Sequence, residues 1–398
     1  MAPNRFRPPV NRKLANSQNP HRKPNCFRTI WKAGLPPRLP VLLLLIGGLI
    51  MYSAFWLSKQ TFESSRHHTA STATDQPQEK LHLVTYVTKP AGVGFCRFLK
   101  SALAVGYEPI VLGGSKNAEM SGEPAKKAKV GGYRQYIDKH VKDTDLVLLV
   151  DGYDVYFQLG PTYMLSKYYS LTSKSPATPI IASAEKGCWP FIMYGETGHD
   201  LCRLAPIPPI PSDLYPTVTD PNDKEPWSKR TTPPRWLNAG TIIGRAHVTI
   251  NATLAYGMRD LFDGITGSEL EAAFDDQGVL LERFLHAKHG IALDYMSDLF
   301  QTFEAAVNDI QIRNVTSPDV SDKGVVKRFW QNVYTRSIPA ILHFNGEGKG
   351  GGVMDEKWRG LWFVGGERPF VPSPHQGYFD EDRLFISYES ACGENGTS

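Results

Sequence analysis

Short apolar runs typical of strands alternate with helix-like stretches through the middle of this chain. Residues 81–87 (LHLVTYV) and 109–114 (PIVLGG) flank a stretch at 95–107 whose Phe and Leu side chains recur at helical spacing. Successive strand–helix–strand units form a sheet that helices cover on both faces, so the pattern predicts an α/β fold with a parallel or mixed central sheet. The other expected strands are residues 146–150, 179–185, 236–244 and 338–345, and the other expected helices are residues 131–141, 161–171, 247–262 and 275–289.

The amino-terminal part of the chain has the pattern of a membrane anchor. Residues 1–40 carry nine Lys and Arg and no acidic residue, and the 17 residues of 41–57 hold no charge. That length is at the lower end of what crosses a bilayer, and the basic side should stay in the cytosol. We expect a basic cytosolic tail, a transmembrane signal anchor at 41–57, a stem at 58–79, one α/β domain at 80–375 and a carboxy-terminal tail at 376–398. The alternative for the apolar segment is a cleaved signal peptide.

The charge balance of the chain argues against a nucleic-acid-binding enzyme. Of its 44 Lys and Arg, nine lie in residues 1–40, which leaves 35 basic against 40 acidic residues in the remainder. A domain that binds nucleic acid usually carries a basic surface, and this remainder is net acidic.

A type II anchor would place the domain in the lumen of the secretory pathway, where disulfides form and Asn residues are glycosylated. Four cysteines follow the anchor, and Cys188 with Cys202 would close the shortest loop between them. This pair is our first expectation, and buried free thiols are the alternative. The three glycan acceptor patterns begin at Asn251, Asn314 and Asn395.

The most informative stretch for chemistry is LVLLVDGYDVYF at 146–157. A buried strand ends at Val150, and the carboxylates of Asp151 and Asp154 follow at its carboxyl end, where ligands bind in open α/β sheets. Because nearby carboxylates repel unless they share a proton or a cation, the pair suggests a Mg²⁺ or Mn²⁺ site. An acidic turn without a metal is the alternative on spacing alone.

Two other places carry candidate functional groups. His343 ends the apolar run AILH before a Gly-rich loop, either as a core histidine or as a ligand at a strand end. Asp275 and Asp276 open an expected helix, where a carboxylate complements the helix dipole or projects into a site.

Taken together, these blocks resemble a known family. The order VTYVTKPAG, GFCRFLKSA, GYEPIVLG, GGYRQYI, LVDGYDVYF, IIASAEKGCWP, RWLNAGTIIG, DDQ and ILHFNG is similar to the glycosyltransferase domain of multifunctional procollagen lysyl hydroxylases, over about residues 81–346. It is more distantly similar to the collagen galactosyltransferases. The resemblance implies a GT-A fold, a UDP-sugar donor, Mn²⁺ and transfer with retention of the anomeric configuration.

The resemblance also implies roles for particular residues. Asp151 and Asp154 match the metal-binding acidic motif, with His343 as the third protein ligand. Tyr153 would stack on uracil, and Arg134 would face the diphosphate in place of an expected Lys. The other positions matched to nucleotide contacts are Thr85 and Val87, at the end of the first strand, and Asn345 and Gly346, in the phosphate loop.

On the sugar side, Trp189 and Asn238 would border the donor sugar, and Asp275 and Asp276 would lie at the reaction centre. The family has a longer acidic run there, and only two carboxylates stand in this chain. The Pro-rich stretch at 203–234 is expected to be a long surface loop and resembles an insertion beside the acceptor side.

The sequence therefore predicts a single-pass type II enzyme of the Golgi or endoplasmic reticulum membrane. It would use Mn²⁺, or Mg²⁺, to transfer glucose or galactose from a UDP-sugar to a glycoprotein or glycan, with retention. The alternatives are a metal-dependent nucleotide-sugar hydrolase and a non-catalytic UDP-sugar-binding protein of the secretory pathway. The sequence leaves open whether the chain forms a homodimer.

Overall fold

The computed structural model describes residues 79–393, apart from 115–119, 175–176, 216–231, 252–253, 287–289, 323 and 367–368. The compact unit that contains them extends from Pro77 to Ser398. The expected cytosolic tail, the anchor and all but the last residue of the expected stem lie outside the described residues. Within the described part, no helix has the length and apolar character needed to cross a membrane.

An eight-stranded mixed sheet forms the centre of the domain, in the order β15-β14-β2-β1-β3-β6-β5-β9. The pairs β14–β2, β2–β1, β1–β3 and β5–β9 are parallel, and β6 runs antiparallel to both of its neighbours. The predicted α/β class with a mixed, mostly parallel sheet flanked by helices is confirmed. The strands are β1 (Leu81–Val87), β2 (Pro109–Gly113), β3 (Leu146–Val150), β5 (Ile180–Glu185), β6 (Trp236–Arg245), β9 (Ile291–Asp294), β14 (Gly377–Asp380) and β15 (Phe385–Ser387).

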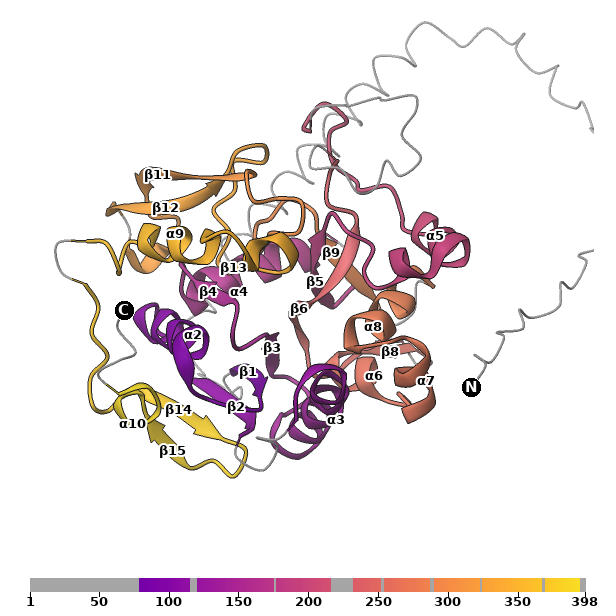
Figure 1. Cartoon of the computed structure of the whole chain (residues 1–398), viewed down its shortest axis with the longest axis horizontal. Coiled ribbons are helices and arrows are strands. Elements are labelled where there is room, and N and C mark those ends of the chain that lie inside the picture. Colours follow the sequence, from indigo (N-terminus) through magenta and orange to yellow (C-terminus); the bar gives the residue numbers. More distant parts are fainter. Residues whose placement is uncertain are drawn as a thin grey trace, which may run out of the picture. The chain divides into compact units, whose positions relative to one another are not determined.

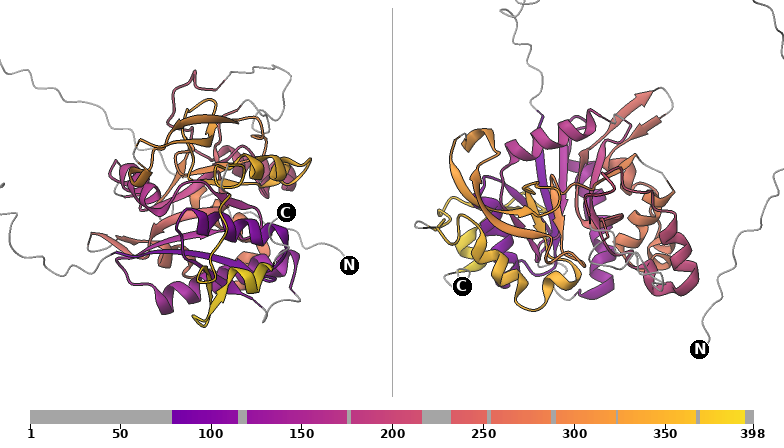
Figure 2. Two further views of the ribbon diagram at one scale, coloured as in Figure 1. Left: turned by 90° about the vertical axis from the view of Figure 1, so that its left-hand side faces the viewer. Right: turned by 90° about the horizontal axis from the view of Figure 1, so that it is seen from above.

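Helices cover both faces of this sheet because alternate strand residues point to opposite sides. On one face Val84, Val147 and Leu149 pack in a common core with side chains of α3, α6 and α8. On the other face Leu83 and Leu148 pack with α2, α4 and α10, and Figure 2 shows helices on both sides of the strands. The helices are α2 (Gly92–Ala104), α3 (Gly122–His140), α4 (Pro161–Thr172), α5 (Gly195–Arg203), α6 (Met258–Phe262), α7 (Gly267–Ala272), α8 (Asp276–Leu285), α9 (Val353–Gly360) and α10 (Tyr388–Cys392).

A second, three-stranded sheet lies at the end of β3 and completes the frame of the site. It has the order β10-β13-β4, with β13 parallel to β10 and antiparallel to β4. Tyr156, Leu342 and Phe344 anchor it in a third apolar core together with α9 and β12. Its strands are β4 (Val155–Phe157), β10 (Phe300–Thr302) and β13 (Ile341–His343), and the hairpin β11 (Ile310–Thr316) and β12 (Val326–Asn332) lies beside it in Figure 1.

Short 3₁₀ helices connect these elements within the described residues: η2 (Phe191–Tyr194), η4 (Val320–Asp322) and η5 (Gly346–Lys349). Part of the expected Pro-rich loop falls in the range 216–231, outside the described residues. Asn314 is exposed on β11, so its glycan acceptor pattern is accessible, whereas Asn395 lies outside the described residues.

The expected helix at 247–262 is wrong. The chain forms the antiparallel pair β7 (Val248–Asn251) and β8 (Leu254–Tyr256), and only α6 follows as a helix. The consecutive β-branched residues Val248, Thr249 and Ile250 explain the difference, because their branched side chains favour strands over helices.

The expected boundary between the folded domain and a carboxy-terminal tail, at residue 376, is too early in the chain. β14 adds to the central sheet beside β2, with Phe379 opposite Ile110, and β15 pairs with β14. A disulfide joins Cys392 of α10 to Cys96 of α2. The folded domain therefore extends to the end of the described residues, because an open sheet edge accepts a strand from any part of the chain.

Candidate active site

Three side chains of metal-ligand type meet where β3 ends. Asp151 directly follows β3, Asp154 precedes β4, and His343 ends β13, which pairs with β4 so that His343 lies opposite Val155. One ligand atom from each of Asp151, Asp154 and His343 lies within 4.8 Å of the others. His343 Nε2 is 3.5 Å from Asp151 Oδ2 and 3.7 Å from Asp154 Oδ2. The structure thus brings the predicted acidic pair and the predicted histidine to one point.

Glycines make this approach possible. A Cβ at Gly152 would lie 2.3 Å from Val87 Cγ2 and 2.7 Å from Thr85 Oγ1, so the turn between the two aspartates rests directly on β1. A Cβ at Gly240 would lie 2.1 Å from Cε1 of His343, because β6 passes directly beside the imidazole. Thr85 and Val87 are fully buried, and their side chains pack against the turn between Asp151 and Asp154.

The three groups hold one another in charged forms. Burial acts to raise the pKa of Asp151, but Lys129 and His343 outweigh it and keep that pKa well below its usual value. Burial also acts to raise the pKa of Asp154, which the hydrogen bond and charge of His343 hold down. Burial would lower the pKa of His343, but the two carboxylates raise it to about 9. The two carboxylates thus favour a positive charge between them, which the proton of His343 supplies here and which a bound cation would supply in its place.

Lysines from two elements surround the carboxylates. Lys129 of α3 has its Nζ 2.8 Å from Asp151 Oδ1 and 2.5 Å from Asp276 Oδ2. Lys349 of η5 has its Nζ 2.8 Å from Asp154 Oδ2. These ammonium groups supply positive charge at the edge where an anionic ligand would meet the carboxylates.

The role of Arg134 at the diphosphate stays a prediction, and in this structure its guanidinium contacts acidic residues outside the Asp151–Asp154–His343 group. Arg134 pairs with Asp263 at 2.7 Å and with Asp138 at 3.8 Å, on a half-exposed part of α3. It is five residues beyond Lys129, which corresponds to about 140° around the helix axis. Lys129 therefore occupies the face of α3 that turns toward Asp151.

Asp275 and Asp276 stand at the start of α8, as expected, and both are buried. Asp275 is the N-cap: its Oδ1 accepts a hydrogen bond from the Gly278 amide. Its Oδ2 accepts from the Trp189 indole N–H at 3.1 Å and lies 3.1 Å from Lys126 Nζ. Asp275 is thus held by three donors.

Asp276 has different partners, because it shares Lys129 with Asp151 of the Asp151–Asp154–His343 group. Burial raises its pKa, as do the charges of Asp151 and Asp275, while Lys129 acts in the opposite direction. Lys129 therefore connects the metal-ligand cluster to the carboxylates at the start of α8, which were expected at the reaction centre.

Trp189 and Asn238 have different surroundings, although both were expected beside the sugar. The Trp189 side chain is 36% exposed and packs edge-on against Phe274 at 5.9 Å between ring centroids. Asn238 is 2% exposed, and its amide donates to Glu185 at 3.0 Å and to Gln277 at 3.1 Å. Trp189 can therefore contact a ligand, whereas Asn238 is buried in a network of amides.

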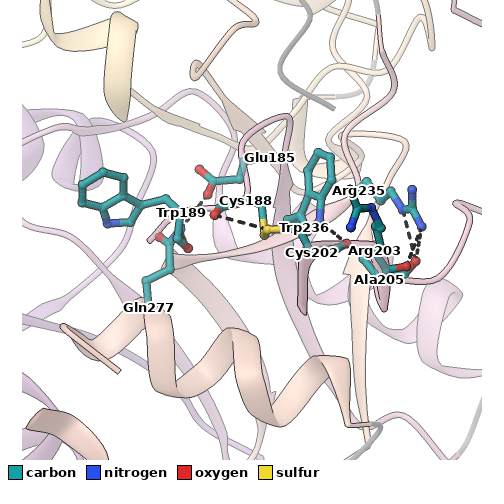
Figure 3. Close-up of a disulfide and its surroundings, with 9 residues drawn as sticks. All are labelled: Glu185, Cys188, Trp189, Cys202, Arg203, Ala205, Arg235, Trp236 and Gln277. Atoms are coloured by element: carbon teal, nitrogen blue, oxygen red, sulfur yellow. Dashed lines mark hydrogen bonds between the residues drawn. A yellow bond between two sulfur atoms is a disulfide. The ribbon is translucent and has the colours of Figure 1, made fainter. Parts of the chain in front are cut away.

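The Trp189 segment is fixed by the predicted disulfide between Cys188 and Cys202, which is confirmed. Figure 3 shows this disulfide between Trp189 on one side and Trp236 on the other. Trp236 donates its indole N–H to the Cys202 carbonyl at 3.0 Å. The disulfide therefore joins the loop that carries Trp189 to α5, close to the first residue of β6.

Tyr153, Asn345 and Gly346 lie in the turns beside the cluster. The Tyr153 ring is 39% exposed and its hydroxyl donates to the Lys89 carbonyl at 3.0 Å, so the ring is held in place. Asn345 is nearly buried, and its Oδ1 accepts from the Phe303 amide at 2.7 Å.

The expected phosphate loop is already engaged by protein atoms. The Glu347 amide donates to Glu304 Oε2 at 3.1 Å, and the amides of Gly348 and Gly350 donate to carbonyls of the same loop. A Cβ at Gly346 would lie 1.5 Å from Glu304 Oε2. In this structure the Glu304 carboxylate occupies the position beside Gly346.

Sequence reasoning missed Lys129, Lys349, Gly240 and Glu185. Lys129 lies just before the expected helix at 131–141, and Gly240 belongs to the motif RWLNAGTIIG. Neither position in the sequence indicates that Lys129 contacts Asp151 or that Gly240 contacts His343. The buried carboxylate of Glu185 follows an apolar strand, and burial raises its pKa to about 8 against the hydrogen bonds of Asn238 and Gln277.

Comparison with known proteins shows what this chain is similar to. Residues 77–193 match the family model described as the PLOD GT domain. The chain is 26% identical over 279 residues to a procollagen-lysine,2-oxoglutarate 5-dioxygenase of Drosophila melanogaster, covering 68% of this chain and 31% of that protein. It is 25% identical over 327 residues to the multifunctional procollagen lysine hydroxylase and glycosyltransferase LH3 of Homo sapiens, covering 79% and 36%. The chain thus matches about a third of the length of these curated relatives.

Solved glycosyltransferase structures show a weaker likeness. Mouse xyloside xylosyltransferase 1 aligns with 67% of this chain and 98% of its own, at 10% identity and a TM-score of 0.38. A likeness of this size carries no weight for fold or activity. The resemblance predicted from the sequence motifs is confirmed by the family match, and the chain contains a domain similar to the glycosyltransferase domain of the PLOD proteins.

Proposed function

We propose that this protein is a retaining glycosyltransferase that uses a UDP-sugar and a divalent cation, Mn²⁺ or Mg²⁺. The donor sugar is glucose or galactose, and the acceptor is a hydroxyl group on a glycoprotein or glycan. The observation that carries the proposal is the convergence of Asp151, Asp154 and His343 at the carboxyl edge of the strands, in a chain whose residues 77–193 match a glycosyltransferase domain.

The residues at this point fit a divalent cation. Two carboxylates and one imidazole are hard or borderline ligands, and their ligand atoms already lie within 4.8 Å of one another. A cation bound there would act as a Lewis acid that offsets the charge developing on the departing UDP. Lys129 and Lys349, which contact the same carboxylates, would add positive charge for the diphosphate.

Retention of configuration requires a carboxylate nucleophile or a front-face attack guided by the leaving group. Asp275 and Asp276 are the candidates to assist either route. Asp275 is oriented by the Trp189 indole and the Gly278 amide, and Asp276 by Lys129. Fixed orientation of a charged group before the reaction is what lowers a barrier that develops charge.

The proposal places the enzyme in the Golgi or endoplasmic reticulum lumen, held by a signal anchor at residues 41–57. The disulfides Cys96–Cys392 and Cys188–Cys202 support a luminal location, because such bonds form and persist in oxidising compartments.

Replacement of the central carboxylate tests the proposal. Asp154→Ala should abolish Mn²⁺-dependent release of UDP from the donor, because one of three protein ligands is lost. The measurement is UDP release across a panel of UDP-sugars, with and without glycan acceptors. Asp200→Ala is the matched control, since Asp200 is an exposed carboxylate paired with Arg203 on α5.

Unchanged turnover of Asp154→Ala at saturating Mn²⁺ would contradict the metal role. The same assay separates transfer from hydrolysis. A transferase gives a glycosylated product that increases with acceptor, whereas a hydrolase yields free sugar at the same rate whether or not an acceptor is present.

A further inference from the structure

Glu185, the last residue of β5, is buried at the centre of the site without belonging to the metal-ligand cluster. Its side chain is 2% exposed. Three amide groups donate to it: Asn238 at 3.0 Å and Asn345 to Oε2, and Gln277 at 2.6 Å to Oε1. Figure 3 shows Glu185 close to the Trp189 loop, with Gln277 of α8 on the other side of that loop.

The amide of Asn345 has only one orientation available. Its Oδ1 accepts hydrogen bonds from the backbone amides of Phe303 at 2.7 Å and Glu304 at 3.1 Å. Backbone N–H groups can only donate, so Oδ1 must face them and the NH₂ group must face Glu185. The contact between Asn345 and Glu185 is therefore a fixed donor–acceptor pair.

The same reasoning fixes the other two amides. Gln277 Oε1 accepts from the backbone amide of Ala239 at 3.2 Å, and Asn238 Oδ1 accepts from the backbone amide of Gly240 at 2.9 Å. The NH₂ groups of both side chains consequently point to Glu185. Among the described residues the side-chain partners of Glu185 are donors, so the ionised carboxylate, which accepts on both oxygens, satisfies this network, while burial raises its pKa to about 8.

Two of these partners are next to groups that the proposed reaction uses. Asn345 stands two residues after His343, and Gln277 directly follows Asp276. The Glu185 carboxylate therefore links the segment of the metal-ligand histidine to the start of α8.

We propose that Glu185 is a positioning residue for sugar transfer. It holds the His343 segment and the start of α8 in fixed positions relative to each other, through its hydrogen bonds with Asn345 and Gln277. This inference rests on the proposed function. Glu185 touches neither the metal ligands nor the carboxylates at the start of α8 in the contacts described, so its effect passes through these amides. Buried groups that orient reacting residues typically change activity by about 10- to 100-fold when they are replaced.

The sharpest test is Glu185→Gln, which keeps size and shape but places an NH₂ group against one of the three donors. We expect kcat to fall by about 10- to 100-fold, while KM for the donor and Mn²⁺-dependent UDP binding change by less than about threefold, because Asp151, Asp154 and His343 stay in place. Glu282→Gln is the matched control, since Glu282 is exposed on α8 and should leave kcat unchanged.

A second variant separates a positioning role of Glu185 from a general loss of folding stability. In Glu185→Gln/Gln277→Glu the donor and the acceptor are exchanged, so the hydrogen bond between positions 185 and 277 can form again. Gln277 also donates to the Trp189 carbonyl at 3.2 Å, and that contact is lost. We therefore expect partial recovery of kcat, by at least fivefold over the single variant.

Three results would overturn the inference. One is a wild-type kcat for Glu185→Gln. Another is a parallel loss of melting temperature and UDP binding with no recovery in the double variant, which would show a structural role alone. The third is absence of UDP binding and transfer in the wild-type protein, which would contradict the proposed function itself and is recognised before any variant is made.

Discussion

At the scale of single residues, the site depends on glycines as well as on its functional side chains. His343 can approach Asp151 and Asp154 because position 240 has no Cβ. The adjoining backbone is equally close, since the Asp151 amide donates to the Gly240 carbonyl at 2.9 Å. Glycine is needed here for close approach of a neighbouring group.

Gly240→Ala should therefore displace the imidazole. The new Cβ would lie 2.1 Å from Cε1 of His343, whose ring is buried. We expect the affinity for Mn²⁺ in the presence of UDP to fall at least about tenfold, as for other changes that reorient a metal ligand. Isothermal titration calorimetry measures it.

Gly131→Ala serves as the control, because a Cβ at that position of α3 meets nothing within 4 Å. It should leave Mn²⁺ binding unchanged and stabilise the helix by about 0.5–1 kcal/mol. Wild-type Mn²⁺ affinity in Gly240→Ala would show that His343 is not a ligand.

At the scale of elements, α3 contributes two different faces to the molecule. Lys129 is nearly buried between Asp151 and Asp276, whereas Arg134 forms half-exposed pairs with Asp263 and Asp138. The burial of an ion pair decides how much the pair contributes to the free energy of unfolding. An exposed pair contributes about 0–1 kcal/mol, and loss of one partner from a buried pair costs about 3–5 kcal/mol.

Replacing each residue by Ala should separate the two faces. Lys129→Ala should lower the free energy of unfolding by about 3 kcal/mol in the absence of metal, because the buried carboxylate of Asp276 and the partly buried one of Asp151 lose their shared cation. Arg134→Ala should change it by less than about 1 kcal/mol. Chemical denaturation of both variants gives these values.

Sugar transfer by the same variants tests whether Lys129 or Arg134 of α3 serves the diphosphate. It should be impaired in Lys129→Ala and retained in Arg134→Ala. Retained transfer in the first and loss in the second would support the assignment of Arg134 to the diphosphate.

At the scale of the whole molecule, the end of the described chain is part of the fold. β14 lies beside β2 in the central sheet, and Cys392 is joined to Cys96 across a sequence separation of 296 residues. A disulfide that closes a long loop restricts the unfolded chain strongly. The second disulfide, between Cys188 and Cys202, spans only 14 residues.

Removing the long-range disulfide should therefore destabilise the domain more than removing the short one. Cys96→Ser/Cys392→Ser is expected to lower the free energy of unfolding by roughly 3–5 kcal/mol, and Cys188→Ser/Cys202→Ser by about 3 kcal/mol or less. Chemical denaturation without reductant measures both. Equal unfolding midpoints for the first variant and the wild type would show that the closure contributes nothing.

The sequence by itself determined the α/β class, most strands of the central sheet, the pairing of Cys188 with Cys202 and the candidate metal-ligand set. These follow from local patterns: buried strands are continuous apolar runs, and the ligands Asp151 and Asp154 stand at a strand end within four residues of each other. The family motifs added His343, which is far away in the chain.

Only the tertiary structure decided which cations meet these carboxylates and which groups hold them in place. Whether Lys129 or Arg134 faces Asp151 depends on the rotation of α3 about its axis, which is set by packing on the sheet. The amide network around Glu185 joins four segments that are distant in sequence, and no local pattern encodes such a meeting. Long-range contacts arise from the packing of whole elements, so they become visible only when the chain is folded.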